Sequence, residues 1–311
     1  QMPFYIITRM LHSAMHGDEF YLDLLSNHTF YFIPVVNMDG VHFIQEEFKK
    51  TGNLVLKRKN MNFEQAAPWL CGDGTRSGVD INRNYGFAFN QGARNDMCSD
   101  AFSGPHPFSE PESRAMRDFI LTNMDNIKFV YNFHATGNYF VEPFNGIDDK
   151  ILPKNFPKQS ELFKELLADG NPPEGIKFGE AKSLLGYVAT GEASDWIMAA
   201  TGIPCISPEL STADPLTKKF YVDKPEYVLD TTDAFYPIIE TTMKKLDAKL
   251  EVKATALQDL GDGRFKFSLE MTNKGMDDMV QDSIVRGLKI AGAVIDNAET
   301  ISGYGLSFLK E

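Results

Sequence analysis

The chain has 311 residues, enough to bury a large core, and this length favours one large domain and one smaller domain. Its 43 acidic and 31 basic residues give a net charge of −12, which argues against a nucleic-acid partner because phosphate binding requires a surplus of Lys and Arg. No apolar run approaches the roughly 20 residues of a membrane-spanning helix, so we expect no membrane span.

The first predicted element is a helix over residues 3–16. Its apolar face includes Leu11, whereas His12 and His16 share the polar face. His16 and Glu19 have the His-x-x-Glu spacing of many zinc sites. Because polar-face histidines at a helix end usually lie in solvent, we interpret them as surface residues rather than metal ligands.

Two patterns then predict a strand and a second helix. Residues 29–36 form an apolar run typical of a buried strand, and residues 37–40 have the composition of a turn. Ser109 and Glu112 have the spacing of a capping box, so we expect a helix to begin at Ser109.

Two further strands are predicted to end at polar residues. The strand over 127–133 places His134 at its carboxyl end, and the apolar run before Glu209 does the same for that carboxylate. Helices alternating with buried strands predict an α/β sheet, in which ligands gather at the carboxyl ends of the strands.

The pattern of apolar and polar residues changes after about residue 248. Apolar and polar residues alternate over 250–256 and again over 265–272, on either side of a Gly-rich turn. This period of two predicts antiparallel strands with one solvated face. We therefore expect a large domain over 1–248 and a small antiparallel β domain, complete or incomplete, over 249–311.

A candidate binding pair lies in the segment VDINRNYGF. Asn82 and Arg83 place an amide beside a guanidinium, a combination that suits a carboxylate because Arg donates to both of its oxygens. An Arg in a loop is more often a surface residue, so this pair alone is weak evidence.

In chain order, seven segments resemble those of the zinc carboxypeptidase family: PVVNMDG, LKRKN, GVDINRNYGF, CSDAFSGPHPFSEPES, FVYNFHATGNYFVEPF, GYVATGEASDW and SPEL. The resemblance extends from Pro3 to about residue 245. It implies a mixed, mainly parallel central sheet flanked by helices, and one Zn²⁺ as cofactor.

The resemblance also implies roles for three polar residues. His134 matches the third zinc ligand of the family, and Glu209 matches the general base that acts on zinc-bound water. Arg58 matches the arginine that stabilises the oxyanion of the tetrahedral intermediate. Such a donor is typically worth about 10²–10³ in rate.

The substrate-binding residues follow in the same way. Asn82 and Arg83 match the pair that holds the C-terminal carboxylate of the substrate, and Tyr187 matches the mobile tyrosine that closes over it. Ser194 and Asn145 match positions in the specificity pocket. Neither is an aspartate, the usual mark of family members that prefer Lys or Arg, and Glu192 is the alternative source of negative charge. We expect no strong preference for C-terminal Lys or Arg.

One family motif is missing from its expected place. The family's His-x-x-Glu motif supplies two zinc ligands, and the resemblance places it just before Gln1. The chain as given therefore holds one of three ligands, and a catalytic zinc needs three. We expect a chain truncated at its N-terminus; the alternative is a degenerate relative.

The three cysteines permit one disulfide and one free thiol. As in many secreted members of the family, the resemblance implies a bond between Cys71 and Cys98, and Cys205 is then a buried thiol. The glycosylation sequon at Asn27 is compatible with secretion. We therefore expect a secreted protein.

The leading hypothesis is a secreted zinc metallocarboxypeptidase that hydrolyses the C-terminal peptide bond of peptides or proteins through a zinc-activated water. On this reading the parent protein is the enzyme, and the chain as given is inactive. The first alternative is a non-catalytic relative that binds carboxylates without zinc. The second is an amidohydrolase with similar zinc chemistry.

Overall fold

The computed structural model describes residues 1–64, 68, 70–72, 74–90, 96–147, 151–211, 225–247, 250–261, 264–273 and 275–276. The chain divides into two compact units, Gln1–Ile238 and Ile239–Glu311. This division lies ten residues before the predicted boundary at 248/249, and the predicted domain assignment stays a prediction.

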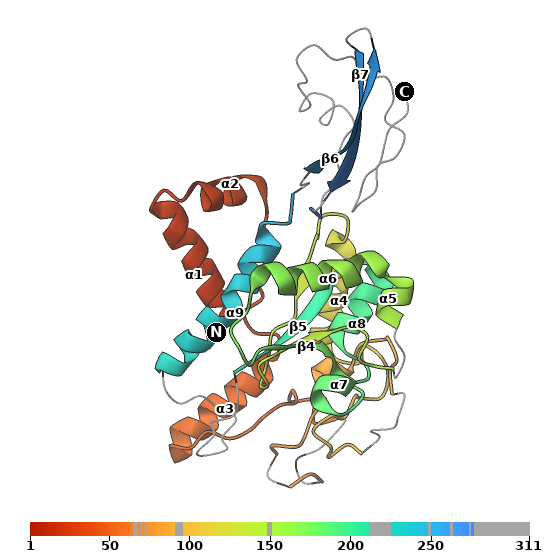
Figure 1. Ribbon diagram of the computed structural model, residues 1–311. Coiled ribbons are helices and arrows are strands. Elements are labelled where there is room, and N and C mark those ends of the chain that lie inside the picture. The colour runs from red at the N-terminus through yellow and green to blue at the C-terminus, as the bar shows by residue number, and fades with distance from the viewer. Residues whose placement is uncertain are drawn as a thin grey trace. The chain divides into compact units, whose positions relative to one another are not determined.

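The helices are distributed along the whole first unit (Figure 1). They are α1 (Met2–Met15), α2 (Glu19–Asn27), α3 (Met38–Thr51), the 3₁₀ turn η1 (Ile81–Arg83), α4 (Pro111–Asn123), α5 (Ile151–Asn155), α6 (Pro157–Gly170), α7 (Ala181–Leu185), α8 (Ala193–Thr201) and α9 (Pro225–Met243). In the described part of the chain, none of them is both long and apolar enough to cross a membrane.

A five-stranded sheet forms the centre of the first unit. Its strands are β1 (Val130–Tyr131), β2 (His134–Ala135), β3 (Tyr139–Glu142), β4 (Lys177–Glu180) and β5 (Cys205–Leu210). The order is β1-β5-β3-β4, with β2 also paired to β5. Only the β3–β5 pairing is antiparallel, which confirms a mixed, mainly parallel sheet.

Helices cover this sheet through apolar clusters. Ile120 of α4 and Ile197 of α8 pack with Cys205 of β5 in one cluster. Phe235 of α9 stacks on Phe140 of β3, with 4.9 Å between ring centroids. Helices on a mainly parallel sheet are the layered α/β architecture that the alternating pattern predicted.

The predicted helix over 3–16 is confirmed as α1, but its buried face is different. The helix buries Met2, Ile6 and Met10, whereas Leu11 is 49% exposed. His12 and His16 lie in solvent as predicted. The apolar residues of α1 outnumber those that one face can bury, so periodicity alone could not select the buried set.

The prediction of a buried strand over 29–36 is wrong. This segment has no strand and no fully buried residue, and Tyr31 and Ile33 are 50% and 41% exposed. A run of apolar residues becomes a strand only when a neighbouring strand takes up its backbone donors and acceptors. No described strand pairs with this segment.

Two other predicted boundaries also differ. Helix α4 begins at Pro111 and has Glu110 at its N-cap, so the predicted capping box does not form. The Ser109 hydroxyl instead donates to the Glu110 carboxylate at 2.7 Å. The predicted strand over 127–133 shortens to β1, because only Val130–Tyr131 pair with β5 before His134 enters β2.

The described part of the second unit contains an antiparallel hairpin. Strand β6 (Leu250–Gly261) pairs with β7 (Arg264–Asn273), with Val252 opposite Met271. The antiparallel pairing agrees with the period-two pattern. On the expected solvated face, the described side chain is Lys253, and it is exposed.

A pair of acidic residues on neighbouring strands gives a prediction about stability. Glu142 of β3 lies opposite Glu180 of β4. Burial, followed by the charge of Glu180, raises the pKa of Glu142 from 4.5 to about 7. The folded chain therefore holds this proton more tightly than the unfolded chain, and the stabilisation is lost as pH rises from about 4.5 to about 7.

We therefore expect Glu142→Gln to raise the free energy of unfolding by about 1–3 kcal/mol at pH 8, since each tenfold change in an acid constant corresponds to about 1.4 kcal/mol. At pH 4 the variant and the parent should be equally stable. Urea unfolding at both pH values measures the difference. An equal gain at both would assign the effect to packing rather than to charge.

Candidate active site

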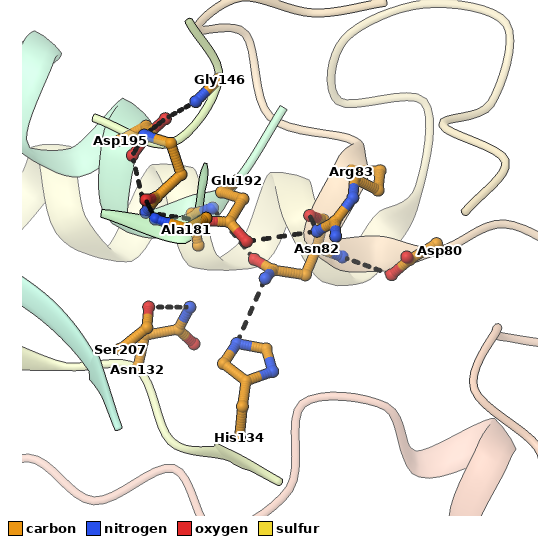
Figure 2. Close-up of polar contacts among 12 residues, drawn as sticks. Asp80, Asn82, Arg83, Asn132, His134, Gly146, Ala181, Glu192, Asp195 and Ser207 are labelled. Atoms are coloured by element: carbon orange, nitrogen blue, oxygen red, sulfur yellow. Dashed lines mark hydrogen bonds and ion pairs between the residues drawn. The ribbon is translucent and has the colours of Figure 1, made fainter. Parts of the chain in front are cut away.

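The site is centred on His134 and Glu209, which two adjacent parallel strands place side by side. His134 of β2 is in register with Glu209 of β5. The Asn82 side-chain amide lies 3.2 Å from the Nε2 atom of His134 (Figure 2). Burial, with the charges of Arg58 and Arg83, lowers the pKa of His134 to about 4. The imidazole is therefore neutral at pH 7.

Glu209 has a carboxyl group whose pKa is close to neutrality. Burial, followed by the charge of Glu192, raises this pKa to about 7, although Arg58 and Arg83 oppose the change. A carboxyl group with a pKa near 7 exchanges a proton readily at neutral pH. The position of Glu209 beside His134 is therefore suited to proton transfer.

Asn82 and Arg83 lie on the short 3₁₀ turn η1. The Asp80 side chain caps this turn by accepting from the Asn82 amide N–H at 3.1 Å. The Ala193 N–H donates to the Asn82 side-chain oxygen at 3.0 Å. Gly191 has φ +70°, and a Cβ atom there would lie 2.2 Å from the Arg83 carbonyl oxygen. This contact requires glycine, so the 191–193 segment packs tightly on the turn.

Arg58 joins the same site through Asp80. Its Nε atom donates to Asp80 Oδ2 at 2.8 Å, and the Asp80 charge raises the pKa of Arg58 above its ordinary value. Lys57 and Lys59, on either side of Arg58, are buried and donate to backbone carbonyls of the 74–77 and 97–99 segments. These contacts connect the LKRKN segment to the loop that carries η1.

Arg83 is buried and pairs with the Glu192 carboxylate, a pairing that the sequence did not predict. Its Nη1 atom donates to the Asn82 carbonyl at 2.7 Å and lies 3.3 Å from Glu192 Oε1. The Asn145 side chain donates to the other Glu192 oxygen at 3.1 Å. Asp195 accepts from the Asn145 and Gly146 amides (Figure 2). The signal available in the sequence was two acids within GYVATGEASDW.

The remaining predicted residues are divided between the buried interior and the surface. Asn145 and Ser194 are buried, and the Ser194 hydroxyl has no hydrogen-bond partner among the described residues. Asn145 also accepts from the Ala181 N–H at 2.7 Å. Tyr187 is 42% exposed, and it lies close enough to Arg58 to contribute to the raised pKa of that guanidinium. All eight predicted site residues, His134 included, therefore gather around η1, β2 and β5.

The cysteines are arranged as predicted. Cys71 and Cys98 form a disulfide across 27 positions of sequence, and Cys205 is a buried free thiol. The disulfide closes the loop that contains η1. Removal of a cross-link from such a loop acts mainly on the entropy of the unfolded chain.

The residues of the site do not fit a catalytic zinc. In the described part of the chain, no three His, Cys, Asp or Glu side chains are grouped as metal ligands. His12 and His16 stack on each other at 4.1 Å between ring centroids, on the exposed side of α1. Because a catalytic zinc needs three protein ligands, His134 alone does not hold one.

The sequence profile of the zinc carboxypeptidase family matches residues 1–235. The chain belongs to this family. Carboxypeptidase B of Astacus astacus is 29% identical over 200 residues, which cover 63% of this chain and 61% of that protein. Carboxypeptidase B2 of Bos taurus is 28% identical over 185 residues, which cover 58% of this chain and 40% of that protein.

Solved structures of the family share the fold. Bovine thrombin-activatable fibrinolysis inhibitor, in complex with tick carboxypeptidase inhibitor, has a TM-score of 0.61 at 22% identity, over 78% of this chain and 75% of that one. Carboxypeptidase A from Helicoverpa armigera has a TM-score of 0.52 at 24% identity, over 67% of this chain and 49% of that one. The chain spans less than two thirds of the curated relatives described above.

Proposed function

We propose that these residues form the substrate-binding and proton-transfer part of a metallocarboxypeptidase, which hydrolyses the C-terminal peptide bond of peptides or proteins. The observation that carries the proposal is the placement of a buried guanidinium, Arg83, next to the His134–Glu209 pair through Asn82. A buried cation within reach of a proton-transfer group suits a substrate that carries a free carboxylate near its reacting bond.

Each side chain then has a part in the proposed reaction. Arg83 and Asn82 bind the terminal carboxylate, which restricts the reaction to the last peptide bond. Arg58 donates to the carbonyl oxygen on which negative charge develops. Glu209, with its pKa of about 7, accepts a proton from water and returns it to the leaving amine. Tyr187, on the exposed side of the site, covers the bound peptide.

The zinc of the family takes part in this proposal only if ligands beyond the described residues complete its site. A bound Zn²⁺ would polarise the scissile carbonyl and acidify a water molecule. His134 offers a neutral imidazole for it, but two more ligands are needed than the described residues provide. We therefore propose that the chain as given binds peptide C-termini without hydrolysing them.

The shortage of zinc ligands also favours a second candidate function, that of a non-catalytic relative that binds carboxylates. The amidohydrolase alternative has less support, because its substrates do not require the Arg83 and Asn82 pair. We also propose a secreted location, which the Cys71–Cys98 disulfide supports because disulfides persist in oxidising compartments.

Binding of matched peptides tests the proposal. We expect a peptide with a free C-terminal carboxylate to bind the 311-residue chain on the order of 100-fold more tightly than the same peptide with a C-terminal amide, since the amide leaves Arg83 without an incoming charge partner. Isothermal titration calorimetry gives both dissociation constants.

After incubation of the 311-residue chain with a peptide and ZnCl₂, we expect mass spectrometry to find only the intact peptide. Equal binding of the acid and the amide would contradict the role of Arg83. Release of the C-terminal amino acid by this chain would contradict the proposal that it lacks the ligands for hydrolysis.

A further inference from the structure

Glu192 is an internal carboxylate at the place where the proposed function puts a substrate carboxylate. The side chains of Arg83 and Glu192 are 8% and 10% exposed and lie 3.3 Å apart. Asn145 holds the second Glu192 oxygen at 3.1 Å. Two contacts from different segments therefore fix this carboxylate next to the guanidinium, and Figure 2 shows the one between Glu192 and Arg83.

Glu192 leaves part of Arg83 available to a ligand. A guanidinium has five N–H donors, of which Nη1 supplies two. Nη1 donates to the Asn82 carbonyl and to Glu192. In the part of the chain that the structure describes, Nε and Nη2 have no protein acceptor. An incoming carboxylate can therefore bind Arg83 through these atoms while Glu192 stays in place.

Carboxyl groups outnumber cationic groups around the Arg83–Glu192 pair. Arg58 is paired with Asp80 and Arg83 with Glu192, so both cations of the site already have partners. Asp195 and Glu209 add two more carboxyl groups, and burial raises the pKa of both. Burial raises the pKa of Glu192 even though Arg83 opposes the change, so the pair with Arg83 does not fully offset the cost of burying this carboxylate. A further anion is unfavourable here, apart from the carboxylate that Arg83 binds directly.

We propose that Glu192 sets the charge preference of this site, so that the chain accepts C-terminal residues with neutral or cationic side chains and rejects C-terminal Asp and Glu. This inference rests on the proposed function and adds the class of C-terminal residue. Ser194 and Asn145 carry no charge, so the sequence-based assignment of the pocket to these two residues gives no such discrimination. Glu192 acts through repulsion of a second carboxylate and through the position in which it holds Arg83.

Peptides that differ in one charge test the inference. Two peptides of the same sequence end in Gln or Glu, which have nearly the same shape. We expect the 311-residue chain to bind the Gln peptide on the order of tenfold more tightly, because a like charge nearby in a partly buried site is strongly unfavourable. In Glu192→Gln the ratio of the two dissociation constants should fall to about one, and the Glu peptide should gain more affinity than the Gln peptide.

A matched control separates the local charge from the net charge. Glu161, on α6, is exposed and pairs with Lys164, so Glu161→Gln removes the same charge from the surface. This variant should keep the tenfold preference for the Gln peptide. The inference is overturned if Glu192→Gln keeps the preference for the Gln peptide, or if the unsubstituted 311-residue chain shows no such preference.

The peptide amides distinguish this failure from failure of the proposed function. If the free acid and the amide bind equally, the carboxylate site itself is wrong. If the free acid binds better but Gln and Glu peptides bind equally, only the role of Glu192 is wrong. Circular dichroism checks the folding of Glu192→Gln, and Glu192→Ser replaces it if the first variant does not fold.

Discussion

Replacement of Arg83 by Gln is expected to lower the free energy of unfolding by about 3–5 kcal/mol, because it leaves the buried Glu192 carboxylate without its charge partner. The same change should weaken binding of peptides with a free C-terminal carboxylate on the order of 100-fold. Urea unfolding and calorimetry measure the two effects. The loss of stability should be larger at pH 8 than at pH 5, since an uncompensated carboxyl group takes up a proton at low pH.

A double variant separates the two effects of this residue. Adding Glu192→Gln to Arg83→Gln removes the buried charge that Arg83→Gln leaves unpaired, so most of the lost stability should return. Peptide binding should not return, because the guanidinium is still absent. If stability stays low in the double variant, Arg83 acts through packing. If binding returns, the carboxylate site lies elsewhere.

Loss of the Cys71–Cys98 disulfide is the second large effect that we expect. The bond closes a loop across 27 positions of sequence, and the chain-entropy relation predicts a loss of about 3–4 kcal/mol in the double Cys→Ser variant. Binding at low temperature should persist, because Lys57 and Lys59 still hold the loop through backbone carbonyls. Thermal unfolding with and without the bond measures the change.

Thiol counting provides the control for this experiment. Alkylation of the native chain should modify no cysteine, since Cys205 is buried and the other two are bonded. Alkylation after unfolding should modify Cys205 alone, and reduction should then release the other two. If the unreduced, unfolded chain has two reactive thiols in addition to Cys205, the disulfide does not form.

Short-range patterns predicted much of the fold. A period of 3.6 residues predicted α1, and a period of two predicted the antiparallel pairing of β6 with β7. The apolar runs before His134 and Glu209 predicted strands at the site, although β1 is shorter than expected. These features depend on residues close together in sequence, so a single sequence contains the signal.

Patterns of the same kind failed where a distant partner decides the outcome. Residues 29–36 have the composition of a buried strand, yet no described strand pairs with them. The capping box at Ser109 did not form, because Glu110 binds Asn60 and Asn62 from another segment as well as Ser109. Local preference is a fraction of a kcal/mol to about 1 kcal/mol, and tertiary contacts exceed it.

The sequence by itself determined the family and the order of the site motifs, and it predicted reacting groups at His134 and Glu209, because each is written in a short segment. Only the tertiary structure decided how these groups are paired. Glu192 meets Arg83 across 109 positions of sequence, and this contact changes the charge of the proposed carboxylate site. The energy of an ion pair depends on the distance and burial of its members, and neither quantity exists before the chain is folded.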